Sequence, residues 1–379
     1  MAISADPIIV KQLQHVAKQR GFSWSTIGHC LWTFDLKVPY ACETLHWILL
    51  FRADWPGYDA PVPDFIFTVD NQNDDDFNPL LGTSAADRQV QQALHRWNKS
   101  ETRLTSLLNC VLASYAEWQR WQVDRLAARN TRLQFELSTI SASPGVGNQL
   151  QTMLQPATAD TVAKVVFVAP LQGVSLRALQ PFLAHVWSQD GSFPEAALSR
   201  LQQSLAVKVT FPLSSDNSGL GGPAIQLIMP LELEGLIGHP TLPQWASSSS
   251  CMVEYFPQLA TTLTEQAARM GPVALQRHAL LQALGESLGW PGESDTVAAR
   301  SATFQLSYDA VAYAVTVEIP LTFPQQQPSI ALQAQGRAQP APATSHSDYP
   351  WSPRWEPKEM ARRMAAFIQQ QVTALSRTV

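Results

Sequence analysis

The sequence predicts an α+β protein of tandem units, each an antiparallel meander of strands packed with helices. Its 379 residues exceed one ordinary core and suit two or three domains. Near both ends of the chain, short runs rich in β-branched and aromatic residues lie between stretches with helical periodicity. The later group repeats the order of the first. We therefore expect two clear units of this kind and a third, degenerate one between them.

The first expected domain covers residues 1–130. Asp6 and Pro7 suit the N-cap and first position of an opening helix, which Gly21 ends. After a polar loop rich in Asn and Asp, apolar residues at i, i+3 and i+4 spacing predict a long helix from near Ser100. Between these helices, strands are expected at residues 31–38, 43–51 and 64–69, with a turn at 39–41.

The second expected domain covers residues 131–257, where the periodicity is weaker. Polar stretches that contain Gly and Ser, at 138–160 and 214–222, separate its strand-like runs. Strands are expected at residues 131–137, 164–170, 206–212 and 224–231.

The third expected domain covers residues 258–379 and repeats the first. Helices are expected at 259–270 and 273–288, and strands at 303–308, 312–319 and 329–332. Gly271-Pro272 is expected to break the helical run, because proline removes an amide donor and clashes with the preceding turn. A Gln-, Ala- and Pro-rich loop is expected at 333–347. Pro357 then begins a closing helix whose Met residues suit a core.

The composition limits the classes of function. Charged residues make up only 15% of the chain, against about 25% in an average soluble domain, which suits a subunit with buried interfaces. A net charge of -5 without a Lys/Arg cluster argues against direct nucleic-acid binding. The apolar run at 45–51 is too short to span a bilayer, and the N-terminus lacks a secretion pattern. The 4 scattered cysteines favour a reducing cytosol or nucleus.

The segment Tyr349-Pro-Trp-Ser-Pro-Arg-Trp355, which we call the proline arm, is the most unusual feature of the chain. Its prolines predict a stiff, extended segment that carries aromatic and Arg side chains, the residue types that dominate interfaces. Packing of the arm on its own sheet is favoured, and docking of a partner stays open. A related proline pattern occurs at residues 55–67. The candidate partner-binding residues are Tyr349, Trp351, Arg354, Trp355, Trp55 and Pro63.

Local motifs predict no catalytic group, metal site or cofactor. The 8 histidines form neither HxH nor HExxH, and no GxSxG or phosphate-loop pattern occurs, so residues 219–222 predict a simple turn. Cys110 lies beside an apolar helical stripe, which favours a packed thiol over a nucleophile. For residues 74–76, all Asp, a solvated loop is favoured over a calcium site, because no spaced ligand series follows.

A helix, a meander whose third strand is flanked by prolines, and a second helix together resemble the ubiquitin-conjugating-enzyme fold. A more specific likeness lies in Leu36-Lys-Val-Pro-Tyr-Ala-Cys-Glu-Thr-Leu-His-Trp47, Pro63-Asp-Phe-Ile-Phe67, Phe323-Pro324 and the proline arm with Glu359-Met-Ala-Arg362. Together these segments resemble the BRE family, the scaffold subunit of the BRISC and breast-cancer-associated A deubiquitinase complexes. The likeness is strong at residues 31–67 and 312–372 and fades between 138 and 250.

This resemblance implies tandem ubiquitin-conjugating-enzyme-variant (UEV) domains, which lack the catalytic cysteine. It implies a scaffold that holds a JAMM-type metalloprotease, an Abraxas-type scaffold and a MERIT-type adaptor together. Ubiquitin is a further candidate partner, and the expected setting is the cytoplasm and nucleus, with a link to the DNA damage response.

The residues themselves are consistent with a non-catalytic role. Active conjugating enzymes carry a nucleophilic Cys after a His-Pro-Asn turn, because the thiolate needs an accessible shelf beside an oxyanion-stabilising Asn. Here Asn78-Pro79 has no preceding His, and no Cys lies between Cys42 and Cys110. A scaffold is therefore expected. The alternatives are a free-standing ubiquitin- or peptide-binding adaptor and an active conjugating enzyme.

Overall fold

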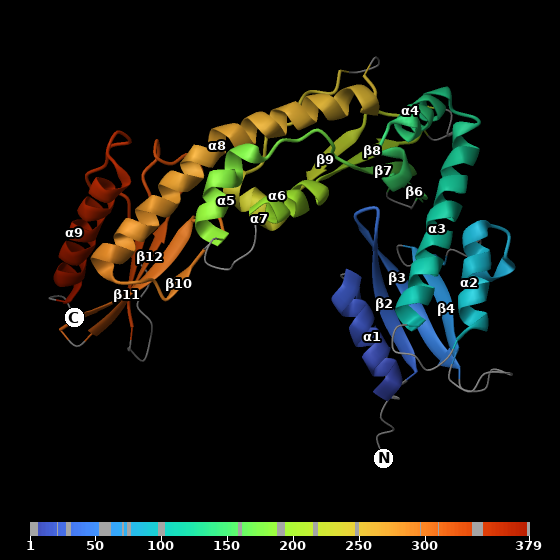
Figure 1. The fold of residues 1–379 in the computed structure, drawn as a ribbon, viewed down its shortest axis with the longest axis horizontal. Helices are drawn as coiled ribbons and strands as arrows, with labels where there is room; N and C mark the ends of the chain where they lie inside the picture. Colours follow the sequence, from blue (N-terminus) through green and yellow to red (C-terminus); the bar gives the residue numbers. More distant parts are fainter. Residues whose placement is uncertain are drawn as a thin grey trace. The chain divides into compact units, whose positions relative to one another are not determined.

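A computed structural model describes residues 7–20, 22–27, 32–52, 62–69, 72–73, 77–97, 103–157, 161–187, 194–214, 219–246, 250–295, 297–309, 311–335 and 344–376. The chain forms two compact units (Figure 1). The first unit consists of residues 1–170 and 207–227, and the second of residues 171–206 and 228–379. Asp6, Ser100 and residues 74–76, on which the sequence made predictions, lie outside the described residues.

The first unit opens with helix α1 (Pro7–Arg20) and a five-stranded antiparallel sheet in sequence order. Its strands are β1 (Ser23–Thr26), β2 (Thr33–Tyr40), β3 (Glu43–Arg52), β4 (Val62–Val69) and β5 (Gln72–Asn73). The expected opening helix and meander are confirmed. Alternate residues of β2 are buried because successive strand side chains point to opposite faces.

The turn between β2 and β3 differs from the prediction. Pro39 and Tyr40 still belong to β2, and Tyr40 pairs with Glu43. Ala41 and Cys42 form the two-residue loop, with φ of 50° and 62°, as the twist of a tight hairpin requires. The predicted turn at 39–41 is wrong because Tyr40 is anchored: its hydroxyl donates to the Thr152 carbonyl oxygen at 2.9 Å.

Two helices pack together after this sheet. Helix α3 (Arg103–Ala127) confirms the predicted long helix, and it places Cys110 half-buried in its middle. Helix α2 (Ala85–His95) follows the short 3-10 turn η1 (Pro79–Leu81) in a stretch predicted to be a loop. A capping box begins α2, in which the Ser84 and Asp87 side chains each accept from the other's backbone N–H, at 3.0 Å in both cases.

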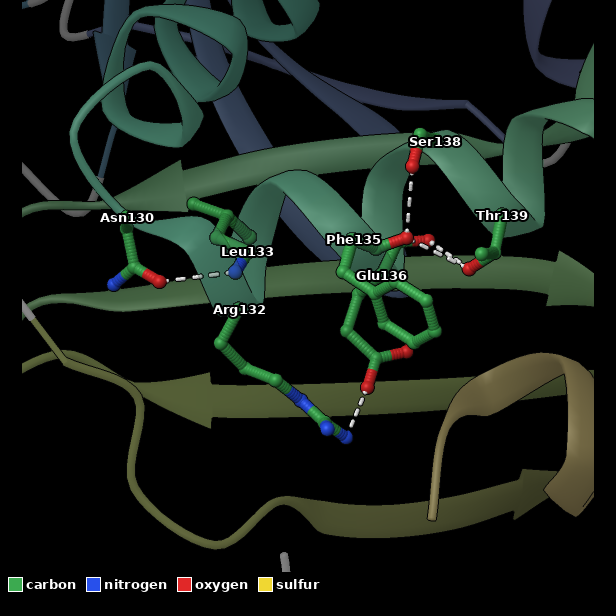
Figure 2. A network of polar contacts seen from close by, with 7 residues as sticks. All are labelled: Asn130, Arg132, Leu133, Phe135, Glu136, Ser138 and Thr139. Carbon is green, nitrogen blue, oxygen red and sulfur yellow. Dashed lines mark hydrogen bonds and ion pairs between the residues drawn. The ribbon is translucent and has the colours of Figure 1, made fainter. Parts of the chain in front are cut away.

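Residues 131–137 are helical, so the strand predicted there is wrong (Figure 2). Helix α4 (Thr131–Ala142) begins at Asn130, whose Oδ1 accepts from the Leu133 N–H at 2.9 Å. Alternating apolar residues favoured a strand, but α4 buries residues at helical spacing and leaves Phe135 48% exposed. Its buried set includes Glu136, which is fully buried and pairs with Arg132 at 2.5 Å.

A second sheet belongs almost entirely to the first unit and has the order β6-β7-β8-β9. Its strands are β6 (Gln151–Gln155), β7 (Lys164–Pro170), β8 (Ala206–Pro212) and β9 (Ala224–Ile228), and the 3-10 turn η2 (Gly147–Gln149) precedes them. The predictions for β7 and β8 are confirmed, whereas β6 lies in a stretch predicted to be a linker. The strand predicted at 224–231 ends at Ile228. Within residues 219–222, the Gly221 N–H donates to the Pro212 carbonyl oxygen at 2.8 Å.

The second unit contains another five-stranded antiparallel sheet in sequence order (Figure 1). Its strands are β10 (Glu293–Ser294), β11 (Ser301–Tyr308), β12 (Val311–Glu318), β13 (Ser329–Ala334) and β14 (Thr344–His346). Its helical elements are η3 (Arg177–Leu179), α5 (Gln180–Trp187), α6 (Pro194–Gln203), α7 (Leu231–Ile237), α8 (Met252–Leu288) and α9 (Pro357–Ser376).

The predicted strands at 303–308, 312–319 and 329–332 and the closing helix are confirmed. Met360 and Met364 of α9 lie in the core between α8, α9 and the sheet, as expected. Part of the predicted loop at 333–347 is β-structure instead: β13 reaches Ala334, and Thr344–His346 pairs with β13 as β14.

Helix α8 runs without a break through Gly271-Pro272, so the predicted interruption is wrong. Proline costs one backbone hydrogen bond, but packing on both sides of this point holds the helix together. At Gly271 the helix touches η3 so closely that a Cβ would lie 2.3 Å from the Ala178 carbonyl oxygen. The glycine is therefore a point of close approach rather than a stop.

Candidate partner-binding surface

The proline arm links β14 to α9 in the second unit, and its first aromatic residue is a packing anchor. Tyr349 is 6% exposed, and its hydroxyl donates to the Pro328 carbonyl oxygen at 2.6 Å. Its ring lies 5.4 Å, centroid to centroid, from that of Phe367 on α9. Burial raises the pKa of Tyr349 far above its ordinary value. The tyrosine thus ties the arm to both the β12–β13 connection and the closing helix.

Trp351 is bound to the same connection but is only half-buried. Its indole Nε1–H donates to the Pro324 carbonyl oxygen at 3.1 Å, and its ring lies 5.8 Å from that of Phe323. The Tyr349 and Trp351 rings contact each other at 6.2 Å, nearly edge to face. The arm therefore packs on its own unit, as the favoured interpretation expected, while part of the Trp351 surface stays accessible.

Arg354 and Trp355 lie at the exposed end of the arm. The Arg354 side chain is exposed, and in the described part of the chain no carboxylate lies within 4.0 Å of its guanidinium. Trp355 is half-buried, with the Arg363 guanidinium 4.1 Å from its ring centroid. Arg363 also pairs with Glu359 at 2.6 Å, so a guanidinium sandwiched between ring and carboxylate holds Trp355 in place.

Hydrogen bonds from Arg362 and Arg363 lower the pKa of Glu359 to about 2. Within the described residues, the end of the arm thus presents Arg354 without a carboxylate partner, beside the Trp355 ring and the ion-paired start of α9.

The two candidates from the other end of the chain fall elsewhere. Pro63 is buried in β4 of the first unit, where it pairs with Phe51 and offers little surface to a partner. Trp55 lies outside the described residues. Of the six candidates, the four in the proline arm thus remain as the candidate surface: Tyr349, Trp351, Arg354 and Trp355.

An aromatic cleft in the first unit was not predicted. Its volume is about 740 Å³, and it lies between η1, α2 and α3. Trp121 is 51% exposed at its edge, with the Arg125 guanidinium 4.7 Å from its ring centroid. Trp118, one helical turn before Trp121, packs on Phe77 at 5.5 Å. The spacing of Trp118, Trp121 and Arg125 on one face of α3 is a sequence signal that was available.

Two of the described cysteines, Cys42 and Cys110, have a raised pKa. Burial raises the pKa of Cys110. Burial also raises the pKa of Cys42, with Glu43 adding to this and Lys208 opposing it. Each thiol is therefore less ionised near neutral pH than an ordinary cysteine. Cys30 lies outside the described residues, and Cys251 is buried at the start of α8.

The described residues contain no group of three or more His, Cys, Asp or Glu residues arranged to hold a metal ion. None of their helices combines the length and the apolar character that a membrane span requires.

Comparison with known proteins identifies the family. The sequence pattern of the family described as brain and reproductive organ-expressed protein (BRE) matches residues 15–335. The chain belongs to the BRE family. It is 26% identical over 355 residues to BRISC and BRCA1-A complex member 2 of Danio rerio, covering 90% of this chain and 82% of the relative. The protein of the same name from Branchiostoma floridae is 24% identical over 357 residues, covering 88% of this chain and 81% of the relative.

The BRE family match confirms the resemblance seen in the sequence segments. The matched range ends at residue 335, before the proline arm and α9. Membership in the BRE family therefore assigns no role to the arm residues, and their role as a docking surface stays a prediction.

Proposed function

We propose that this chain is a non-catalytic scaffold subunit of a ubiquitin-chain deubiquitinase complex. The observation that carries the proposal is the BRE family match over residues 15–335, together with relatives named as members of the BRISC and BRCA1-A complexes. In this role the chain joins a JAMM-type metalloprotease module to Abraxas-type and MERIT-type subunits and contacts ubiquitin. It acts in the cytoplasm and nucleus.

Two properties of the structure support a scaffold. The first is the set of three sheets packed with helices, two of five strands and one of four, which we interpret as UEV-like units within domains at 1–130, 131–257 and 258–379. The second is the raised pKa of the Cys42 and Cys110 thiols, which disfavours the thiolate that a conjugating enzyme needs. Large domains without an activated nucleophile suit assembly rather than chemistry.

Co-expression with the three proposed partner types tests the assembly. We expect one complex of fixed stoichiometry in size-exclusion chromatography with mass measurement, and cleavage of ubiquitin chains only when the metalloprotease subunit is present. A chain that stays monomeric beside all three partners, yet retains ubiquitin on a column, is a free-standing adaptor instead.

A second assay addresses catalysis directly. The purified chain, incubated with activating enzyme, ATP and ubiquitin, should give no adduct that thiol reagents reverse. Formation of such an adduct, and its loss in Cys110→Ser or Cys42→Ser, identifies an active conjugating enzyme and contradicts the proposal.

A further inference from the structure

Arg277 of α8 is a fully buried cation whose hydrogen bonding is incomplete. Its side chain is 0% exposed, and its Nη2 donates to the Leu236 carbonyl oxygen at 2.8 Å. Nε and Nη1 have no acceptor within hydrogen-bonding distance among the described residues. A buried guanidinium is costly unless it is paired and fully hydrogen-bonded, so this arrangement calls for an additional acceptor.

A polar pocket of about 540 Å³ lies beside this arginine in the second unit. Gly235, the neighbour of Leu236, forms part of its wall. Arg300 also lines the pocket, and its buried Nε likewise has no acceptor among the described residues. Burial and, to a smaller extent, the positive charge of Arg300 lower the pKa of Arg277 to about 10, while the negative charge of Asp295 opposes them. The two guanidinium groups are thus near enough to repel each other.

Among the described residues, the acidic residues of the pocket form no ion pair with either arginine. Asp295 Oδ1 accepts from the N–H groups of Val297 and Ala298, at 3.2 and 2.8 Å, and so holds the turn between β10 and β11. Glu318, at the end of β12, is exposed. Among the described residues, neither carboxylate lies within 4.0 Å of an Arg277 or Arg300 nitrogen. Arg300 in the pocket wall and Arg277 behind it therefore have no carboxylate in the described part of the chain that completes their hydrogen bonds.

Neutral donors surround the same space. Gln326, Gln327, Ser301 and Ser329 line the pocket with Arg300. Thr322 donates to Gln326 Oε1 at 2.8 Å, so the NH2 group of that amide is the end that remains for a ligand. Guanidinium, amide and hydroxyl donors around one pocket are the groups that bind oxyanions, because each oxygen accepts several hydrogen bonds.

We propose that the pocket between α7, the β10–β11 turn and the β12–β13 connection binds an oxyanion, through Arg300 with Arg277 behind it. The shared chemistry of the ligand is a carboxylate or phosphate group with two or more charged oxygens. The site does not depend on the proposed membership in a complex, because all of its residues come from the second unit of this chain.

Titration of the purified full chain with inorganic phosphate, pyrophosphate and citrate tests this proposal. The ionic strength is held constant with NaCl, and isothermal calorimetry and thermal melting report binding. We expect saturable binding of at least one probe and a rise in melting temperature that NaCl alone does not give. Binding of the phosphates alone identifies a phosphate-bearing ligand, and binding of citrate alone a carboxylate-bearing one.

Three variants assign the binding to this pocket. Arg300→Gln should weaken the affinity at least tenfold, because it removes the charged donor that lines the site. Glu318→Gln should increase the affinity a few-fold, because it removes a negative charge that repels the anion. A purely structural role of these residues does not predict this increase. Arg362→Gln removes an exposed arginine of the same unit and should leave the affinity unchanged.

Arg277→Met, which keeps most of the side-chain volume, should also abolish binding if it folds. The Arg300→Gln variant decides the matter if it does not. Absence of saturable binding by all three probes overturns the proposal, as does equal affinity in the wild type and Arg300→Gln. Equal losses in Arg300→Gln and Arg362→Gln likewise overturn it, because the anions are then attracted by net charge.

Discussion

The two five-stranded sheets of this protein have the same strand order, but different types of side chain pack against them. In the first unit, the rings of Trp47, Phe67, Phe77 and Tyr115 contact one another with centroids 4.7 to 5.8 Å apart. In the second unit, the inner face of the sheet packs mainly on aliphatic and Met side chains of α8 and α9. The first core thus concentrates its contacts in a few large rings, and the second spreads them over many smaller side chains.

In the second unit, the connection between the third and fourth strands is fastened by the proline arm. Tyr349 and Trp351 each donate a hydrogen bond to a proline carbonyl of this β12–β13 connection. The corresponding β3–β4 connection of the first unit lies outside the described residues. In the second unit, the arm thus joins the sheet to the closing helix.

The largest expected effect comes from the aromatic core. Trp47 is 0% exposed, so Trp47→Ala should lower the free energy of unfolding of the first unit by about 3–5 kcal/mol. Hydrogen exchange with mass spectrometry on the full chain should show lost protection of β2, β3 and β4, with the second unit unchanged. Trp121→Ala, which truncates a half-exposed ring, is the matched control and should leave protection intact. Unchanged protection in Trp47→Ala contradicts the importance of the ring cluster.

The sequence predicted this core partly correctly. Large aromatic residues in strands normally face a core, so the sequence favours burial of both Trp47 and Phe65. Trp47 is buried, but Phe65 is only half-buried and stacks on Phe67 at 5.7 Å. Alternation along a strand indicates the face of a residue, and it does not say how far the covering helix extends over that face. Phe65→Ala should therefore lower the free energy of unfolding of the first unit by less than Trp47→Ala does.

The strands were predicted more reliably than the helices for a physical reason. The meanders alternate regularly and are rich in β-branched residues, so their pattern is local. Helix α2 depends on the Ser84–Asp87 capping box and on Ser114 of α3, which donates to Asp87 at 2.5 Å. Helix α8 continues through Pro272 because distant segments pack against it. These features rest on contacts between segments far apart in the sequence, which periodicity does not report.

The next effect concerns the arm as a clamp. Tyr349→Phe keeps the ring but removes the hydroxyl that donates to Pro328, leaving a buried carbonyl oxygen without that partner. The cost should be about 1–3 kcal/mol, confined to the second unit. Chemical denaturation followed by hydrogen exchange of β13 and α9 measures it. Tyr308→Phe, on a half-exposed tyrosine of the same sheet, serves as the control. Equal stabilities of the two variants would contradict a stabilising role of the Tyr349 hydroxyl.

A smaller effect separates docking from packing in the same segment. Arg354 is exposed, so Arg354→Ala should leave the melting temperature unchanged but weaken association with a complex partner by about tenfold, equivalent to about 1.4 kcal/mol. Affinity measured with the co-expressed partners, beside the melting curve of the same variant, tests this. Arg362→Ala on α9 is the matched control. If Arg354→Ala binds like the wild type, the arm is internal packing alone.

The smallest effect compares two acids, each in the first turn of a helix. Burial alone would raise the pKa of Asp87 in α2, but hydrogen bonds from Ser114, Ser84 and Thr83 bring it below its ordinary value. Glu359 in α9 is partly exposed, and hydrogen bonds from Arg362 and then Arg363 lower its pKa from 4.5 to about 2. The Asp87 carboxylate thus accepts hydrogen bonds from neutral donors in the buried capping box, whereas the Glu359 carboxylate is paired with two arginines near solvent.

Salt distinguishes these two arrangements, because exposed ion pairs are screened and buried hydrogen bonds are not. In carboxyl NMR titrations, 1 M NaCl should raise the pKa of Glu359 toward its ordinary value and leave that of Asp87 nearly unchanged. A depressed pKa in the folded state means that the Glu359 contribution to stability is present above about pH 4.5 and is lost as the pH falls toward 2. Arg362→Gln should raise the pKa of Glu359 at low salt, and a Glu359 that titrates near 4.5 in the wild type would show that its ion pairs do not persist in solution.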